Sequence, residues 1–143
     1  MSGNVSKGRI LAIDFGSKRV GLALSDISQF LASPLETVEN KGYHFLVQEI
    51  VRIVYRENVK GILVGEPLHM DGSVSDMSKR ARRLANKLKA AVPVPVLMWD
   101  ERLTSQSAKD ILIQTGKSPS RQRHRIDQIA AAALLQSFLD RKK

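Results

Sequence analysis

The sequence predicts an α/β protein with a mixed five-stranded sheet and helices on both faces. Two observations carry this prediction. Short apolar runs bounded by glycine or acidic residues alternate with longer segments whose apolar residues recur at helical spacing. The first three runs are joined by short turns, which predicts antiparallel strands, whereas each later run follows a helical segment, which predicts parallel strands. The 143 residues have the length of one domain, so we expect a single domain over 1–143 with 1–8 as a flexible N-terminal tail.

The hydrophobic pattern places the elements along the chain. Pro34, in the third strand, favours an edge position because proline cannot donate a hydrogen bond to a neighbouring strand. Right-handed crossovers make the first, fourth and fifth strands parallel, with their carboxyl ends at one end of the sheet. Strands are predicted over Arg9–Asp14, Val20–Ser25, Leu31–Val38, Val59–Gly65 and Val94–Trp99. Helices are predicted over Tyr43–Glu57, Ser75–Ala90, Thr104–Ile113 and Ile126–Leu139.

Acidic residues stand where the parallel strands end. The first strand ends in Asp14 before a glycine turn, and an ionised carboxylate there needs a cation or hydrogen-bond donors. The alternative is that Asp14 only hydrogen-bonds its own turn. Glu66, Asp100 and Glu101 follow the other two parallel strands, so the four carboxylates are predicted to converge. Carboxylates without cysteine or histidine suit Mg²⁺ or Mn²⁺, and two such ions can promote displacement at a phosphate.

Basic residues outnumber acidic ones. Lys and Arg total 23 against 14 Asp and Glu, and this formal charge of +9 favours a polyanionic partner. The segment Thr115–Arg125 has four positive side chains and no core-forming pattern, so a mobile basic loop is predicted. A second concentration of cations on one predicted helix favours contact with phosphates, with a solvated helix face as the alternative. Its members are Lys79, Arg80, Arg82, Arg83, Lys87 and Lys89.

The chain contains no cysteine, which excludes disulfides and thiolate metal sites. Residues 1–8 lack the apolar core of a signal peptide. No segment offers the run of about 18 apolar residues that a transmembrane helix needs. We therefore expect a soluble, cytoplasmic protein without a membrane partner.

Asp127 stands on the apolar stripe of the last predicted helix. The residues four, seven and eleven positions further on are Ala131, Leu134 and Phe138, so the Asp127 side chain is expected along a mostly apolar face. An acid that faces a sheet usually has a partner. The alternative is that Asp127 lies in the first turn of the helix and stabilises the helix dipole, by about 0.3–1 kcal/mol.

Three segments together resemble the YqgF family, also called RuvX, of RNase H-like proteins related to the RuvC Holliday junction resolvases. They are IDFGSKRVGLALSD at 13–26, DERLTS at 100–105 and IDQIAA at 126–131. The resemblance spans nearly the whole chain. It implies an RNase H-like three-layer fold and a metal-dependent nuclease that processes the 5′ end of pre-16S ribosomal RNA in ribosome biogenesis. The alternatives are a Holliday junction resolvase acting on branched DNA and a non-catalytic RNA-binding module.

The resemblance also implies site residues. It places catalytic carboxylates at Asp14, Asp127 and the Asp100–Glu101 pair, with Asp14, Asp100 and Asp127 as ligands of Mg²⁺ or Mn²⁺. The sequence does not decide which member of the pair is the ligand. Glu66 departs from the family, which more often has an aliphatic residue there, and solvent exposure is favoured over a ligand role for it.

Basic residues near these acids or in the basic segments are candidate nucleic-acid contacts. Arg102 either holds a phosphate or neutralises Glu101. The full set is Lys18, Arg19, Arg82, Arg83, Arg102, Arg121 and Arg123.

The expected partners are nucleic acid and ribosomal particles. The sequence does not decide between RNA and branched DNA, between endo and exo cleavage, or between a monomer and a homodimer. The Asp-x-Gly turn also resembles the phosphate-binding turn of actin-like and sugar-kinase ATPases. Those proteins close two such domains on a nucleotide, and this chain has the length of one.

Overall fold

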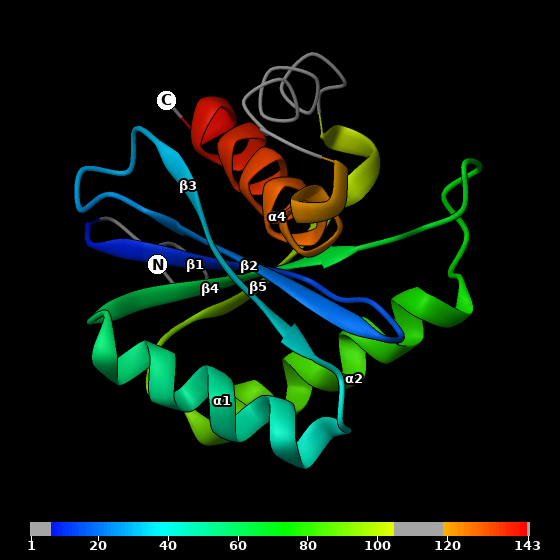
Figure 1. Cartoon of the computed structure of the whole chain (residues 1–143), viewed down its shortest axis with the longest axis horizontal. Coiled ribbons are helices and arrows are strands. Elements are labelled where there is room, and N and C mark those ends of the chain that lie inside the picture. The colour runs from blue at the N-terminus through cyan, green and yellow to red at the C-terminus, as the bar shows by residue number, and fades with distance from the viewer. Residues whose placement is uncertain (1–6, 105–118, 143) are drawn as a thin grey trace.

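A computed structural model describes residues 7–104 and 119–142 (Figure 1). Its sheet has five strands in the order β3-β2-β1-β4-β5. β1 pairs antiparallel with β2, and β2 with β3, whereas β1 with β4 and β4 with β5 are parallel. The predicted mixed sheet is therefore confirmed. The strands are β1 (Arg9–Asp14), β2 (Arg19–Ser25), β3 (Ala32–Glu39), β4 (Val59–Glu66) and β5 (Val96–Asp100).

Helices cover both faces of the sheet and make three layers (Figure 1). α1 (Tyr43–Arg56) and α2 (Asp76–Ala91) lie on one face, and α4 (Pro119–Lys142) lies on the other. Along β1, Leu11 and Ile13 join the core under α1 and α2, while Ile10 and Ala12 join the core under α4. A strand buried on both faces is apolar at every position, which explains the unbroken apolar run before Asp14.

The strand that contains Pro34 lies at the edge of the sheet, as the sequence predicted, and it is irregular beside the proline. β3 lies at the edge of the sheet, and its pairing with β2 shifts between Leu22, which faces Glu36, and Ala23, which faces Pro34. Proline is tolerated at such a bulge on an edge strand because it removes no necessary ladder hydrogen bond. Among the described residues, no helix is long and apolar enough to cross a membrane.

The last helix begins earlier than the sequence predicted. α4 starts at Pro119 and not near Ile126, so the predicted basic loop over 115–125 is wrong for residues 119–125. Proline fits the first turn of a helix, where its missing N–H costs nothing. The apolar stripe marked only the packed part of the helix, because a polar extension needs no core-facing pattern. Residues 105–113 of the predicted Thr104–Ile113 helix and residues 115–118 lie outside the described residues.

Candidate active site

The carboxyl ends of β1, β4 and β5 meet at one end of the sheet, and each carries an acid. Asp14 continues the alternation of Ala12 and so lies on the face that α4 covers. Glu66 and Asp100 are register partners on the two neighbouring strands. Glu66 continues the alternation of Val64 along β4, and Asp100 continues that of Met98 along β5. Both side chains therefore lie on the face that α2 covers. The structure thus divides the strand-end acids between the two faces of the sheet.

Glu101 lies on the same face as Asp14. It begins the 3₁₀ turn η1 (Glu101–Leu103), which directly follows β5. A Cβ added to Gly65 would overlap Leu134 of α4 and would lie 3.0 Å from Glu101 Oε2. The Glu101 carboxylate, whose Oε2 is buried, therefore lies across the end of β4 on the α4 side.

Asp127 belongs to α4 and lies at the same end of the sheet as Asp14. Gly21, the register partner of Asp14, lies so close to α4 that an added Cβ would overlap the carbonyl group of Asp127. The helix begins at Pro119, so Asp127 stands in its third turn, and the alternative of a first-turn dipole role is wrong. The Asp127 Oδ2 accepts a hydrogen bond of 2.7 Å from Arg19 Nε.

The chemistry of this group fits a divalent cation. Asp14, Glu101 and Asp127 offer carboxylate oxygens, the donors that Mg²⁺ and Mn²⁺ prefer. Gly21 and Gly65 carry no side chains, which lets the α4 backbone and the Leu134 and Glu101 side chains come close to the sheet there. Within residues 7–104 and 119–142, no three acidic or histidine side chains are gathered closely enough to share one ion. The Asp127 carboxylate is instead engaged by Arg19.

Asp100 has a different partner. Its carboxylate accepts hydrogen bonds from the Arg102 backbone N–H at 2.9 Å, from Nε at 3.0 Å and from Nη2 at 2.7 Å. Arg102 Nη1 also donates to the Met70 carbonyl at 3.3 Å. The pair ties the end of β5 to the loop over 67–75. The sequence had left open whether Arg102 holds a phosphate or neutralises Glu101; in the structure it pairs with Asp100.

The same contact predicts a pH effect. Arg102 lowers the pKa of Asp100 by hydrogen bonding to its carboxylate, and burial opposes this only in part. Because the folded-state pKa lies below the unfolded value of about 3.9, the stabilisation is present above that pH and is lost as the pH falls through the folded-state pKa. We expect Arg102→Gln to raise the pKa of Asp100 toward its ordinary value, measured by NMR titration of the carboxyl carbon. An unchanged pKa would contradict the assignment.

Glu66 is not solvated, so the favoured expectation of solvent exposure is wrong. It is 8% exposed, and its carboxylate pairs with Arg82 of α2. The position faces the inner side of α2, where a carboxylate must be compensated, and an arginine on the covering helix supplies the charge. This ion pair holds α2 against the end of β4.

The pair predicts a stability difference between two neighbouring arginines. Arg82→Gln should lower the free energy of unfolding by about 1–3 kcal/mol, because the buried Glu66 carboxylate loses its partner. Arg83, the next residue on α2, is the matched control. Its guanidinium carbon lies over the Tyr43 ring, 5.9 Å from the ring centroid. Arg83→Gln should therefore change stability by about 0.5 kcal/mol or less. Chemical denaturation measures both. Equal losses in the two variants would show that Glu66 does not depend on Arg82.

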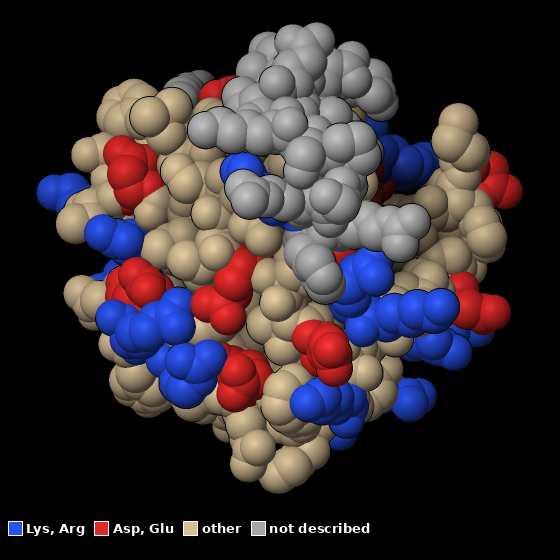
Figure 2. Space-filling model, in the orientation of Figure 1, with Lys and Arg blue, Asp and Glu red and all other residues tan. Residues whose placement is uncertain are grey.

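The predicted basic helix is α2, and its six cations are exposed. Figure 2 shows basic side chains on the side of the molecule where α2 lies. Arg83 and Lys87 both lie over the Tyr43 ring, at 5.9 and 5.6 Å from its centroid. Arg121 and Arg123 belong to the first turns of α4, and their side chains lie outside the described part of the structure.

A comparison with known protein families shows which family the chain belongs to. The RuvX family profile, described as Holliday junction resolvase, matches residues 8–141. The chain belongs to the RuvX family. A protein of Syntrophus aciditrophicus (strain SB) named "Putative pre-16S rRNA nuclease" is 39% identical over 132 residues, 92% of this chain and 88% of the relative. A Bacillus cereus (strain B4264) protein with the same name is 39% identical over 137 residues, 94% of this chain and 99% of the relative.

Solved structures show the same fold in this RuvX protein. T. thermophilus RuvC in complex with a Holliday junction substrate matches with a TM-score of 0.64 at 18% identity. The match covers 94% of this chain and 96% of the RuvC chain. A Fowlpox virus resolvase in complex with Holliday junction DNA has a TM-score of 0.59 at 13% identity, over 94% and 98% of the two chains. The family resemblance and the RNase H-like fold predicted from the sequence are confirmed.

The sequence reasoning missed the packing role of two glycines. Gly21 belongs to the first family-like segment and Gly65 matches the family's glycine and proline loop after the fourth strand, but neither was expected to mark a close approach. In the RuvX structure they are the positions at which α4 and the Glu101 side chain approach the sheet. A glycine inside a strand often marks a close approach of another group, and that signal could have identified both.

Proposed function

We propose that this RuvX protein is a Mg²⁺- or Mn²⁺-dependent nuclease that hydrolyses phosphodiester bonds near the 5′ end of pre-16S rRNA. The observation that carries the proposal is that three acidic positions from separate elements lie at the same end of the sheet, on the face that α4 covers. Asp14 ends β1, Glu101 follows β5, and Asp127 lies where α4 contacts the neighbour of β1.

In this proposal Asp14, Glu101 and Asp127 hold the cation. Asp14 ends the buried central strand β1, and Glu101 directly follows β5, which is paired with β4. Their backbone positions are therefore fixed before substrate arrives, which lowers the cost of ordering the site. A bound divalent cation would supply activation of the attacking water and stabilisation of negative charge on the phosphate. Asp100 is a positioning residue here, because it holds Arg102 and through it the loop over 67–75.

The substrate is proposed from the relatives. Proteins 39% identical to this chain over nearly its whole length carry the name of pre-16S rRNA nuclease. A nucleic-acid substrate also accords with the formal charge of +9 and with the exposed cations of α2. Ribosomal particles that contain this RNA are the proposed partners.

Branched DNA is the second candidate substrate. The RuvX profile is described as Holliday junction resolvase, and the RuvC structure with its junction substrate shares this fold. A likeness at 18% identity concerns the fold alone, so the closer relatives favour RNA.

The test compares both substrates under the same conditions. The purified protein is incubated with a transcript that contains the 5′ leader of 16S rRNA, or with a four-way DNA junction, in Mg²⁺ or in EDTA. We expect cleavage of the transcript in Mg²⁺, none in EDTA and none by the Asp14→Asn variant. Cleavage of the junction alone would replace RNA by branched DNA as the substrate. Absence of cleavage of either would overturn the proposal.

A further inference from the structure

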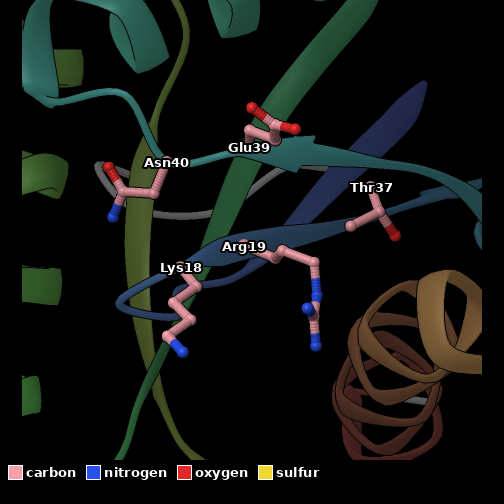
Figure 3. Close-up of a pocket in the computed structure, with 5 residues that line it drawn as sticks. All are labelled: Lys18, Arg19, Thr37, Glu39 and Asn40. Atoms are coloured by element: carbon pink, nitrogen blue, oxygen red, sulfur yellow. The ribbon is translucent and has the colours of Figure 1, made fainter.

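A pocket opens beside the candidate active site, where β2 begins and β3 ends. Its volume is about 280 Å³, near the lower limit of about 300 Å³ for small-molecule sites, so it suits one small group and not an extended ligand. Figure 3 shows the Lys18 and Arg19 side chains pointing to the same side of the sheet, with the Arg19 guanidinium beside α4. The Glu39 side chain points to the opposite side. The lining residues are Lys18, Arg19, Thr37, Glu39 and Asn40.

The pocket has a rigid frame. The Asn40 backbone N–H donates to the Lys18 carbonyl at 2.9 Å, and Asn40 Nδ2 donates to the Gly16 carbonyl at 2.9 Å. These bonds fix the β1–β2 turn to the end of β3. Two cationic side chains on a fixed frame are suited to a phosphate group, because little order has to be imposed when it binds.

The two cations of the pocket differ in their partners. Among the described residues, no acid pairs with the Lys18 side chain, whereas Arg19 Nε bonds to Asp127 Oδ2 at 2.7 Å. The Arg19 and Asp127 side chains are 44% and 26% exposed, and ion pairs with this exposure are weak. A divalent cation that takes the Asp127 carboxylate can therefore displace Arg19 from it.

We propose that this pocket binds a backbone phosphate of the substrate and that Arg19 couples phosphate binding to cation binding at the acids. Arg19 holds Asp127 in the cation-free protein. When Asp127 turns to the cation, Arg19 becomes available to the phosphate in the pocket, beside Lys18. The proposal rests on the proposed function, since it requires both a cation and a nucleic-acid strand at this end of the sheet.

Coupling of this kind is reciprocal. If the cation releases Arg19 for the phosphate, nucleic acid must in turn raise the affinity for the cation by the same factor. The arrangement also prevents Arg19 from attracting nucleic acid strongly before the cation is in place. Within the part of the chain that the structure describes, Lys18 pairs with no acid, so its contribution should not depend on the cation.

The test measures binding and not cleavage. A fluorescein-labelled RNA hairpin is titrated with the full chain in EDTA and in Ca²⁺, which takes the same oxygen ligands as Mg²⁺. Gel analysis checks that the RNA stays intact. Arg19→Gln should weaken binding by about 5-fold or more in Ca²⁺ and by less than about 2-fold in EDTA, within the usual range of coupling between sites. The matched control, Lys18→Gln, should weaken binding equally in both conditions.

A second variant releases Arg19 without a cation. In an Asp127→Asn background Arg19 no longer faces a charged partner, so Arg19→Gln should now weaken binding in EDTA as well, by about 5-fold. Equal effects of Arg19→Gln in EDTA and Ca²⁺ in the parent protein would overturn the coupling. So would the absence of any effect of Arg19→Gln in Ca²⁺.

The control separates this inference from the proposed function. If Lys18→Gln weakens binding but Arg19→Gln does not follow the expected pattern, the coupling fails and the proposed nuclease function stands. If the parent protein binds neither the RNA hairpin nor a four-way DNA junction in Ca²⁺, both fail together.

Discussion

Glu101→Gln is expected to reduce cleavage by at least about 10²- to 10³-fold, whereas Asp100→Asn should reduce it by about 10-fold or less. A lost cation ligand removes several kcal/mol of transition-state stabilisation. Glu101 lies on the α4 face across Gly65, the face that carries Asp14. The Asp100 carboxylate lies toward the other face and is held by Arg102.

The two variants make a matched pair, because each replaces one carboxylate by its amide in adjacent positions. Initial cleavage rates on the 16S leader transcript, with Asp14→Asn as the inactive reference, measure the difference. Thermal melts with increasing Mg²⁺ give a second readout, since a cation stabilises the folded state according to its affinity. Mg²⁺ should raise the melting temperature of Asp100→Asn as it does for the parent, and much less for Glu101→Gln. The reverse pattern would make Asp100 the ligand.

The sequence predicted the strands and their directions well because burial on both faces imposes a strong pattern. The run from Ile10 to Asp14 is apolar until its last residue, and β1 accordingly lies in the centre of the sheet. The carboxyl end of the sheet was also predictable, since parallel strands joined by right-handed crossovers must end together.

The face on which each acid lies was not predicted. Glu66, Asp100 and Glu101 stand at strand ends, and a shift of one residue moves a side chain to the other face of the sheet. That shift separates Asp100 from Glu101 in the structure. The partner of Glu66 was equally hidden, because Arg82 was one of six cations expected to contact phosphates, and only the placement of α2 over β4 pairs it with Glu66.

The start of α4 was missed for a related reason. Hydrophobic periodicity reports the part of a helix that packs against a core, and α4 packs on the sheet through residues such as Ile129 and Leu134. The polar turns that precede them carry no such signal. Placing Asp127 in the first turn followed from that omission, and it made a dipole role look plausible where the structure has an ion pair with Arg19.

Gly21→Ala is expected to destabilise the protein by at least about 3 kcal/mol, the upper end of the cost of overpacking. The added Cβ would overlap the backbone carbonyl of Asp127, and backbone inside a helix cannot move aside as a side chain can. Either α4 shifts away from β2 or the strand bends. A loss of this size should lower the melting temperature by about 6–12 °C in a chain of this length, and the displacement of Asp127 should remove cleavage at temperatures where the variant is folded.

Gly65→Ala is the control, because its added Cβ would meet the ends of side chains and not backbone. The atoms concerned are Leu134 Cδ1 and, at 3.0 Å, Glu101 Oε2. Side-chain ends can shift more readily than helix backbone, so the stability loss should be about 1 kcal/mol, the lower end of the cost of overpacking a core. The Glu101 carboxylate must move, however, and a misplaced catalytic group costs about 10- to 100-fold in rate. Calorimetry and cleavage rates should therefore separate the two alanine variants: Gly21→Ala should lose much stability as well as activity, and Gly65→Ala should lose activity with only a small loss of stability. Full activity in a stable Gly65→Ala variant would exclude Glu101 from the site.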